Sequence, residues 1–331
     1  MNQHDLIAEV FERQAKRRVE RRAFLKFAGM STAVAGAVAV SACGGGGGGD
    51  DGLSVGENVN TPPPVTGLSD ADILNFALNL EYLEAQFYSF AAFGTGLAPT
   101  LLTGTGTQGA VTGGRQVTFT DQVVRQYANE IAADEIAHVA FLRSALGSAA
   151  VAQPAIDISA NANGPFSQAA VAAGLITQGQ MFDPYANDEN FLLGAYIFED
   201  VGVTAYKGAS PLLKSATFLS AAAGILGAEA YHAGLIRTVL YAKGIQTPSL
   251  IDATEAISKA RDDLDNPIED DQGVRGSGGA SNIVPTDANG IAYSRSAGDV
   301  LNIVYLNPGA VNKGGFFPNG VNGPINTSTV G

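Results

Sequence analysis

Apolar side chains recur at helical spacing in four long segments of the chain. These segments cover residues 69–93, 120–146, 188–208 and 215–243. The first shows the pattern well, with apolar positions three and four residues apart at Ile73, Phe76, Ala77, Leu80, Leu83, Phe87 and Phe90. The pattern therefore predicts four long helices, each with an apolar face.

Residues that begin and end helices agree with these bounds. Ser69 or Asp70 is a suitable N-cap for the first helix, and Gly147 follows the second. Pro211 interrupts the chain after the third helix, and Gly244 follows the fourth.

The connections between the helices differ in length. Residues 94–118 are rich in Gly and Thr and show no helical pattern, whereas residues 148–187 form a long link that can hold a short helix at 166–178. A fifth helix is expected at 248–264. The Gly-, Asn- and Pro-rich tail from 273 onward is expected to be irregular, with one apolar run at 300–305.

Four long helices with a long second connection predict an all-α fold. A long crossover lets the third helix start at the same end as the second, so a four-helix bundle with one crossover relates its two halves by a pseudo-two-fold. We assign residues 67–245 to this bundle and residues 246–331 to an irregular C-terminal extension packed on it.

The first 42 residues have the features of an export signal. Residues 20–26 resemble the twin-arginine signal, with Arg21 and Arg22 as the pair, and a weakly apolar stretch follows. It ends Ser-Ala-Cys, which resembles a lipoprotein cleavage box with Cys43 as the acylated residue. We therefore expect export to the periplasm or cell envelope and a lipid anchor in the membrane. The alternative is a plain cleavable signal.

Residues 43–66 resemble a flexible tether. They contain a run of six Gly followed by Asp-Asp, and a Pro-rich end. Such a segment can join an acylated cysteine to a folded domain.

Composition narrows the chemistry further. The 331 residues have a net charge of −13, and the part after residue 42 has 12 basic and 28 acidic residues, a net charge of −16. This acidity argues against binding to nucleic acid. The single Cys excludes sites with several cysteine ligands, and the three His limit any histidine-based metal site.

The two halves of the predicted bundle repeat a set of polar residues. Glu81 precedes Tyr88 by seven residues in the first helix, and Glu199 precedes Tyr206 by seven in the third. The second and fourth helices each contain Glu-x-x-His, followed at equal offsets by Arg and Leu. The residues of these two motifs are Glu135, His138, Arg143 and Leu146 in the second helix, and Glu229, His232, Arg237 and Leu240 in the fourth.

This repeat predicts a site for two metal ions. Residues three apart share one helical face, so each Glu-x-x-His can hold one ion, and the paired glutamates add two carboxylates. Four buried carboxylates are costly unless cations neutralise them. Mixed carboxylate and imidazole ligands favour iron or manganese, with zinc less suited. The predicted ligands are Glu81, Glu135, His138, Glu199, Glu229 and His232.

At this point the sequence resembles the ferritin-like superfamily, whose di-metal carboxylate sites take one Glu from each of two helices and Glu-x-x-His from each of the others. The segments 79–88 and 314–320 are similar to the exported ferritin-like family that includes desiccation-related proteins. The resemblance implies a fold and a ligand set more than an activity.

Several neighbouring residues compete for roles. Glu84 can replace Glu81 as a ligand, but its counterpart in the repeat is Gly202, so we expect it to support the site or to lie at the surface. Glu130 can be an extra ligand, although a solvated position suits it better. Asp134 and Asp200 are expected at the surface, or as partners of a histidine ring nitrogen.

Tyr88 and Tyr206 are expected to support the site rather than to be redox-active.

Three functions fit this reading. The first is oxidation chemistry at a di-metal centre: ferroxidase-like with dioxygen or peroxide as the oxidant, or manganese-catalase-like on peroxide. The second is a non-enzymatic envelope protein that protects against desiccation or oxidative stress, with structural or vestigial metals. Mineral storage is the third and the weakest, because the insertion, the extension and a lipid anchor oppose closure of a shell. A homo-dimer is also compatible with the sequence.

Overall fold

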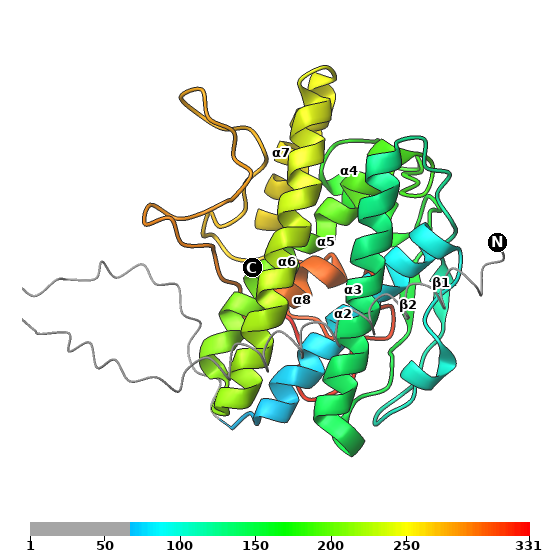
Figure 1. Cartoon of the computed structure of the whole chain (residues 1–331), viewed down its shortest axis with the longest axis vertical. Coiled ribbons are helices and arrows are strands. Elements are labelled where there is room, and N and C mark those ends of the chain that lie inside the picture. Colours follow the sequence, from blue (N-terminus) through cyan, green and yellow to red (C-terminus); the bar gives the residue numbers. More distant parts are fainter. Residues whose placement is uncertain (1–66) are drawn as a thin grey trace, which may run out of the picture. The chain divides into compact units, whose positions relative to one another are not determined.

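Four long helices form the body of the computed structural model, which describes residues 67–331. They are α2 (Asp70–Phe93), α3 (Gln122–Leu146), α5 (Asp188–Ala209) and α6 (Ala216–Gly244). Helix α2 packs mainly against α3, and α5 packs mainly against α6. Figure 1 shows α3 and α6 side by side, running in opposite directions. The all-α prediction is confirmed, whereas the predicted signal, Cys43 and the tether lie outside the described residues.

Side-chain caps begin each of these helices. Ser69 forms a reciprocal capping box with Asp72 at the start of α2. Asp121, Asn187 and Ser215 accept backbone N–H groups at the starts of α3, α5 and α6. These caps place the helix starts within two residues of the bounds predicted from the sequence.

The connections hold structure that the hydrophobic pattern did not predict. Residues 94–118 contain a short 3-10 helix, η1 (Pro99–Leu101), and the strand β1 (Val111–Gly113). β1 pairs in parallel with β2 (Ile156–Ile158) from the long crossover. Strands of three residues are too short for an alternating pattern to be recognised, and their pairing partners lie far away in sequence.

One further helix lies in the crossover, and another follows the bundle. The crossover helix α4 (Pro165–Ala172) is shorter than predicted, because the chain turns at Gly174 with a positive φ of 68°. Helix α7 (Pro248–Asp262) follows α6 almost as predicted. None of the helices in residues 67–331 is long and apolar enough to cross a membrane.

The C-terminal tail is less irregular than predicted. Residues 297–305 form the helix α8 (Ala297–Tyr305), which begins with a capping box between Ser296 and Asp299. The prediction of an irregular tail is wrong for these residues, since the apolar run is the buried C-terminal part of a nine-residue helix that contacts α5. The side chain of Asn302 is fully buried and donates to the backbone carbonyls of Asn307 and Thr329, which holds the chain end against α8.

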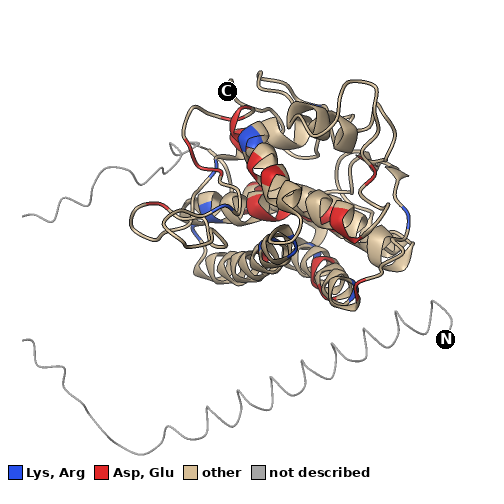
Figure 2. Ribbon diagram, turned by 90° about the horizontal axis from the view of Figure 1, so that it is seen from above, with Lys and Arg blue, Asp and Glu red and all other residues tan. Residues whose placement is uncertain are grey.

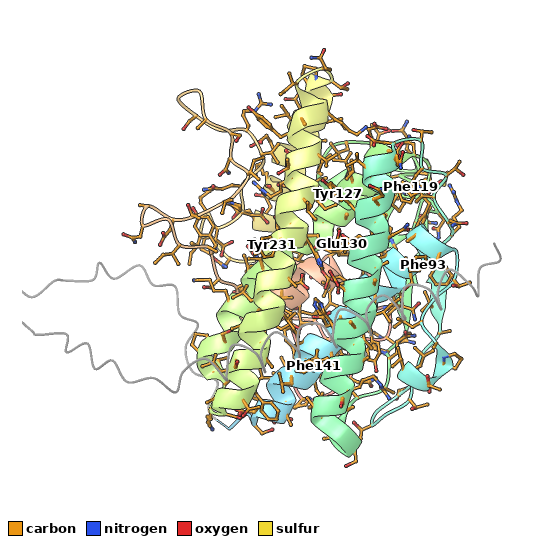
Figure 3. All side chains as sticks on the ribbon, in the orientation of Figure 1. Phe93, Phe119, Tyr127, Glu130, Phe141 and Tyr231 are labelled. Carbon is orange, nitrogen blue, oxygen red and sulfur yellow. The ribbon has the colours of Figure 1, made fainter. Side chains whose placement is uncertain are left out.

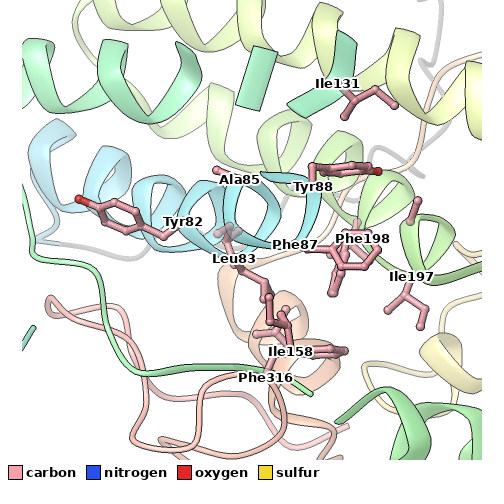
Figure 4. Close-up of a cluster of buried hydrophobic side chains, with 14 of the residues drawn as sticks. Tyr82, Leu83, Ala85, Phe87, Tyr88, Ile131, Ile158, Ile197, Phe198 and Phe316 are labelled. Carbon is pink, nitrogen blue, oxygen red and sulfur yellow. The ribbon is translucent and has the colours of Figure 1, made fainter. Parts of the chain in front are cut away.

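An aromatic cluster joins the tail to the bundle. Phe87 of α2 lies 5.5 Å from Phe198 of α5, measured between ring centroids, and Phe198 lies 4.9 Å from Phe316 of the tail. Phe166 of α4 lies 5.1 Å from Phe316. Figure 4 shows this cluster between α2, α5 and the tail. Burial of each ring contributes roughly 2–3 kcal/mol, so the tail is part of the core.

Two glycines, one on α5 and one on α6, allow a direct test of this packing. A Cβ added at Gly208 would lie 1.9 Å from the backbone oxygen of Arg295, whereas a Cβ at Gly224 would meet nothing within 4 Å. We expect Gly208→Ala to lower the free energy of unfolding by about 2 kcal/mol through overpacking. Gly224→Ala should raise it by about 0.5–1 kcal/mol, because alanine favours a helix. Urea unfolding checks both; equal effects of the two substitutions would contradict the packing described.

Candidate metal centre

The six predicted ligands lie together inside the bundle. One residue comes from each of α2 and α5, and a Glu-x-x-His pair comes from each of α3 and α6. All are buried except His138, whose side chain is 12% exposed. The six are Glu81, Glu135, His138, Glu199, Glu229 and His232.

Their ligand atoms fall into two groups that share Glu229. One group consists of Glu81, Glu135, His138 and Glu229, and the other of Glu199, Glu229 and His232; within each group the ligand atoms lie within 4.8 Å of one another. Ligands at about 2.1 Å from one ion are separated by roughly 3 Å or more, so each group is compact enough to hold an ion.

One contact between a histidine and a glutamate repeats in the two groups. His138 Nδ1 lies 3.2 Å from Glu81 Oε2, and His232 Nδ1 lies 3.6 Å from Glu199 Oε2. In each half of the bundle, the histidine therefore faces the single glutamate of the same half. This is the pseudo-two-fold that the repeat predicted.

Two carboxylates lie between the histidines. Glu135 Oε1 is 3.1 Å from His232 Nδ1, while Glu135 Oε2 is 3.5 Å from His138 Nδ1. Glu229 Oε1 is also 3.5 Å from His138 Nδ1. Glu135 thus presents one oxygen to each half, and Glu229 belongs to both groups. The carboxylates of both residues would therefore be available to a metal in either group.

Several buried polar atoms of the centre make no hydrogen bond. Both carboxylate oxygens of Glu135 and of Glu229 make no hydrogen bond, and neither do Glu199 Oε2 and His232 Nδ1. Buried carboxylates without donors are strongly destabilising unless cations neutralise them. Carboxylate and imidazole groups left without hydrogen-bond partners form a donor set that fits divalent metal ions.

Burial dominates the electrostatics of the metal-free centre. Desolvation raises the pKa of Glu81 to about 8, and it also raises the pKa values of Glu199 and Glu229. Glu135 differs, because His138 and His232 outweigh the effect of its burial and lower its pKa. Burial opposes charge on both histidines as well, but the surrounding carboxylates raise their pKa values. The centre therefore holds protons where metals would bind.

The two tyrosines of the repeat orient the single glutamates. The hydroxyl of Tyr88 donates to Glu199 Oε1, and that of Tyr206 donates to Glu81 Oε1. Each tyrosine therefore holds the glutamate of the opposite half and leaves its Oε2 facing a histidine. Burial raises the pKa of both tyrosines well above the usual value, which keeps the hydroxyl protons in place.

Glu84 is buried beside the centre, so a surface position is wrong for it. Gly202, its counterpart in the repeat, lies close to Glu229 and Glu84. A Cβ at Gly202 would lie 2.4 Å from Glu229 Oε2 and 3.4 Å from Glu84 Oε1. Glu84 is not part of either ligand group, and its burial together with nearby carboxylates raises its pKa.

The other acidic neighbours have three different environments. Asp134 is half-exposed, with Oδ2 3.4 Å from His232 Nε2, so it is placed to hold that ring. The predicted surface position of Asp200 is wrong, because this residue is buried and pairs with Arg237 and Arg261. Glu130 is exposed on α3, as Figure 3 shows.

The repeated arginines support the helices that carry the single glutamates. Arg143 Nη1 donates at 2.5 Å to the hydroxyl of Tyr82, which follows Glu81. Arg237 Nη1 donates at 2.7 Å to Asp200, which follows Glu199. The equal spacing of these arginines is visible in the sequence but their role is not, since their partners lie on other helices.

Comparisons with known proteins agree with this geometry. The sequence profile described as "Ferritin-like domain" matches residues 69–242. The chain is 30% identical over 272 residues to the "Ferritin-like catalase Nec2" of Nesocodon mauritianus, a match covering 78% of this chain and 85% of that protein. It is also 32% identical over 244 residues to the "Desiccation-related protein PCC13-62" of Craterostigma plantagineum, covering 69% of this chain and 75% of that protein. The chain therefore belongs to the ferritin-like domain family.

Proposed function

We propose that this protein binds two iron or manganese ions and disproportionates hydrogen peroxide. The observation that carries the proposal is the pair of His–Glu groups that share Glu229 and face the same bridging Glu135. Such a pair can hold two redox metals a few ångströms apart. The name of one relative, a ferritin-like catalase, supports peroxide as the substrate.

In this reaction two peroxide molecules yield one dioxygen and two waters. The metal pair supplies the chemistry when bound, because two ions can together take two electrons from one peroxide and return them to another. Glu135 and Glu229, which lie between the histidines, would hold the ions and balance their charge. Tyr88 and Tyr206 hold the single glutamates in place, so those ligands need little rearrangement.

A second candidate is protection of the cell envelope against drying, with metals that only stabilise the fold. The relative named as a desiccation-related protein favours it. For either function we propose export and anchoring through Cys43, a proposal that rests on the signal-like sequence of residues 20–43.

Histidine replacement tests the redox function. We expect the purified protein to hold two metal ions and to decompose peroxide. His138→Ala and His232→Ala should each lose metal and lower kcat/KM by at least about 100-fold, since each removes a nitrogen ligand. Tyr231→Ala, next to His232 but with its own side chain 78% exposed, is the matched control and should retain both.

Metal analysis and a peroxide-decay assay give these values. The catalase proposal fails if peroxide decays no faster with the metal-loaded protein than with free metal. Survival of an indicator enzyme after drying tests the second function. If His138→Ala protects this enzyme as well as the unaltered protein does, the result supports the second function.

Two isosteric variants separate Glu81 from Glu84. Glu81→Gln should lose the ion beside His138, because Glu81 Oε2 faces that ring at 3.2 Å. Glu84→Gln should keep both ions, since Glu84 lies outside the ligand groups. Metal stoichiometry by elemental analysis checks both. The opposite result would make Glu84 the ligand.

The metal-free protein should lose stability as the pH rises. The folded state holds protons on Glu81 up to a pKa of about 8, and the pKa values of Glu199 and Glu229 are also raised. An unfolded glutamate releases its proton near pH 4.5, so the folded state binds more protons between these values and is favoured at the lower pH. The histidines add to this loss above their ordinary pKa of about 6.5. The lowered pKa of Glu135 acts only below pH 4.5.

Unfolding in EDTA at pH 5.5 and at pH 8 measures this effect. We expect at least about 2 kcal/mol less stability at pH 8, and a smaller difference for the metal-loaded protein, in which metal replaces the protons. Glu130→Gln, at an exposed position, should not change the difference in stability between the two pH values. A metal-free protein that is more stable at pH 8 would contradict the electrostatics described.

A further inference from the structure

A second acidic cluster lies at the end of α7, with no residue in common with the metal centre. Asp262 is the last residue of α7, and Asp265 and Asp270 follow in the next loop. Their carboxylate oxygens lie within 4.8 Å of one another. Figure 2 shows a group of acidic and basic positions near the C-terminus, and Gly331 lies against the backbone of Asp265.

The buried charges around this cluster do not balance. Arg237, Arg261 and Arg295 are buried with four aspartates that pair with them: Asp200, Asp265, Asp270 and Asp271. One negative charge is therefore in excess, and the half-buried Asp262 adds a second. Two excess charges are what one divalent cation neutralises.

Asp270 is the member that most needs a partner. Its side chain is 1% exposed, and neither of its carboxylate oxygens makes a hydrogen bond. Its Oδ1 lies 3.0 Å from Arg295 Nη2, but that arginine also pairs with Asp265 and Asp271. One guanidinium is thus shared among three buried carboxylates, and Asp270 is left under-compensated.

The neighbouring carboxylates keep oxygens in the same small space. Asp265 accepts from Arg295 Nε at 2.6 Å and from the backbone N–H of Asn266 at 2.7 Å. Asp262 Oδ1 accepts from the backbone N–H of Asp270 at 3.3 Å. Asp262 also lines a polar surface groove with Asp263 and Glu269, so this member of the cluster is reached by water.

We propose that Asp262, Asp265 and Asp270 bind one calcium ion. The donors are all carboxylate oxygens on a helix end and an irregular loop, which suits the flexible oxygen coordination of calcium better than the strict octahedron of magnesium. Water from the groove can complete the coordination.

An ion bound at this site would link separate parts of the fold. Arg295, which pairs with Asp265 and Asp270, also donates to Thr204 of α5 at 3.0 Å. Its backbone lies directly against Gly208 of the same helix. Calcium at the aspartates would therefore fasten the segment before α8 to α7 and, through Arg295, to the bundle.

Calcium titration of the metal-loaded protein tests this proposal. We expect one calcium per chain by calorimetry, with a Kd between about 10⁻⁵ and 10⁻³ M. Calcium at 100 times Kd should raise Tm by about 5 °C, and dialysis into calcium-free buffer should reverse the rise. Asp262→Asn and Asp270→Asn should each weaken calcium binding at least about 10-fold. Asp263→Asn, at an exposed neighbouring position, should bind like the unaltered protein.

Stability in EDTA separates loss of the site from loss of the fold. Asp270→Asn removes an excess buried charge, so this variant should be at least as stable in EDTA as the unaltered protein. The proposal is overturned if the unaltered protein binds no calcium up to 10 mM, a concentration of about ten times the weakest expected Kd. It is also overturned if Asp270→Asn binds calcium with unchanged affinity.

Discussion

Carboxylates buried in the middle of a helix bundle are the constraint on which this structure depends. Glu81, Glu135, Glu199 and Glu229 are at most 1% exposed, and Glu84 lies beside them. Helix packing alone cannot supply the hydrogen bonds that so many charges need, and several of their oxygens have none. Cations or protons must therefore occupy the centre. Metals and protons compete for the same atoms, so folding, metal loading and pH are coupled in this protein.

The rest of the fold positions these charges. Each half contributes one helix with a single glutamate and one with Glu-x-x-His, and each tyrosine reaches across to the glutamate of the other half. The repeated arginines hold the residue after each single glutamate, Tyr82 in one half and Asp200 in the other. The symmetry is broken at Gly202, where a missing side chain leaves room for the carboxylate of Glu229 near Glu84. This break distinguishes the two halves chemically.

The C-terminal extension completes the bundle. Phe316 packs among aromatic rings of α4 and α5, and Arg295 brings the preceding segment against α5. Asp200, next to Glu199, pairs with Arg237 and Arg261, and Arg261 also pairs with Asp271. A chain of ion pairs thus connects the proposed calcium loop to the helix that carries a ligand. We infer that ions at the loop and at the centre both add to the stability of α5.

The sequence by itself determined the four helices, their pairing into two halves and the six candidate ligands. These features depend on local spacing, because a period near 3.6 and an offset of three residues are visible along the chain. Only the tertiary structure decided the rest. It brought β1 to β2, made α8 part of the core, buried Asp200 among arginines and placed Glu84 against Glu229. Each of these depends on contacts between residues far apart in sequence, where spacing along the chain carries no signal.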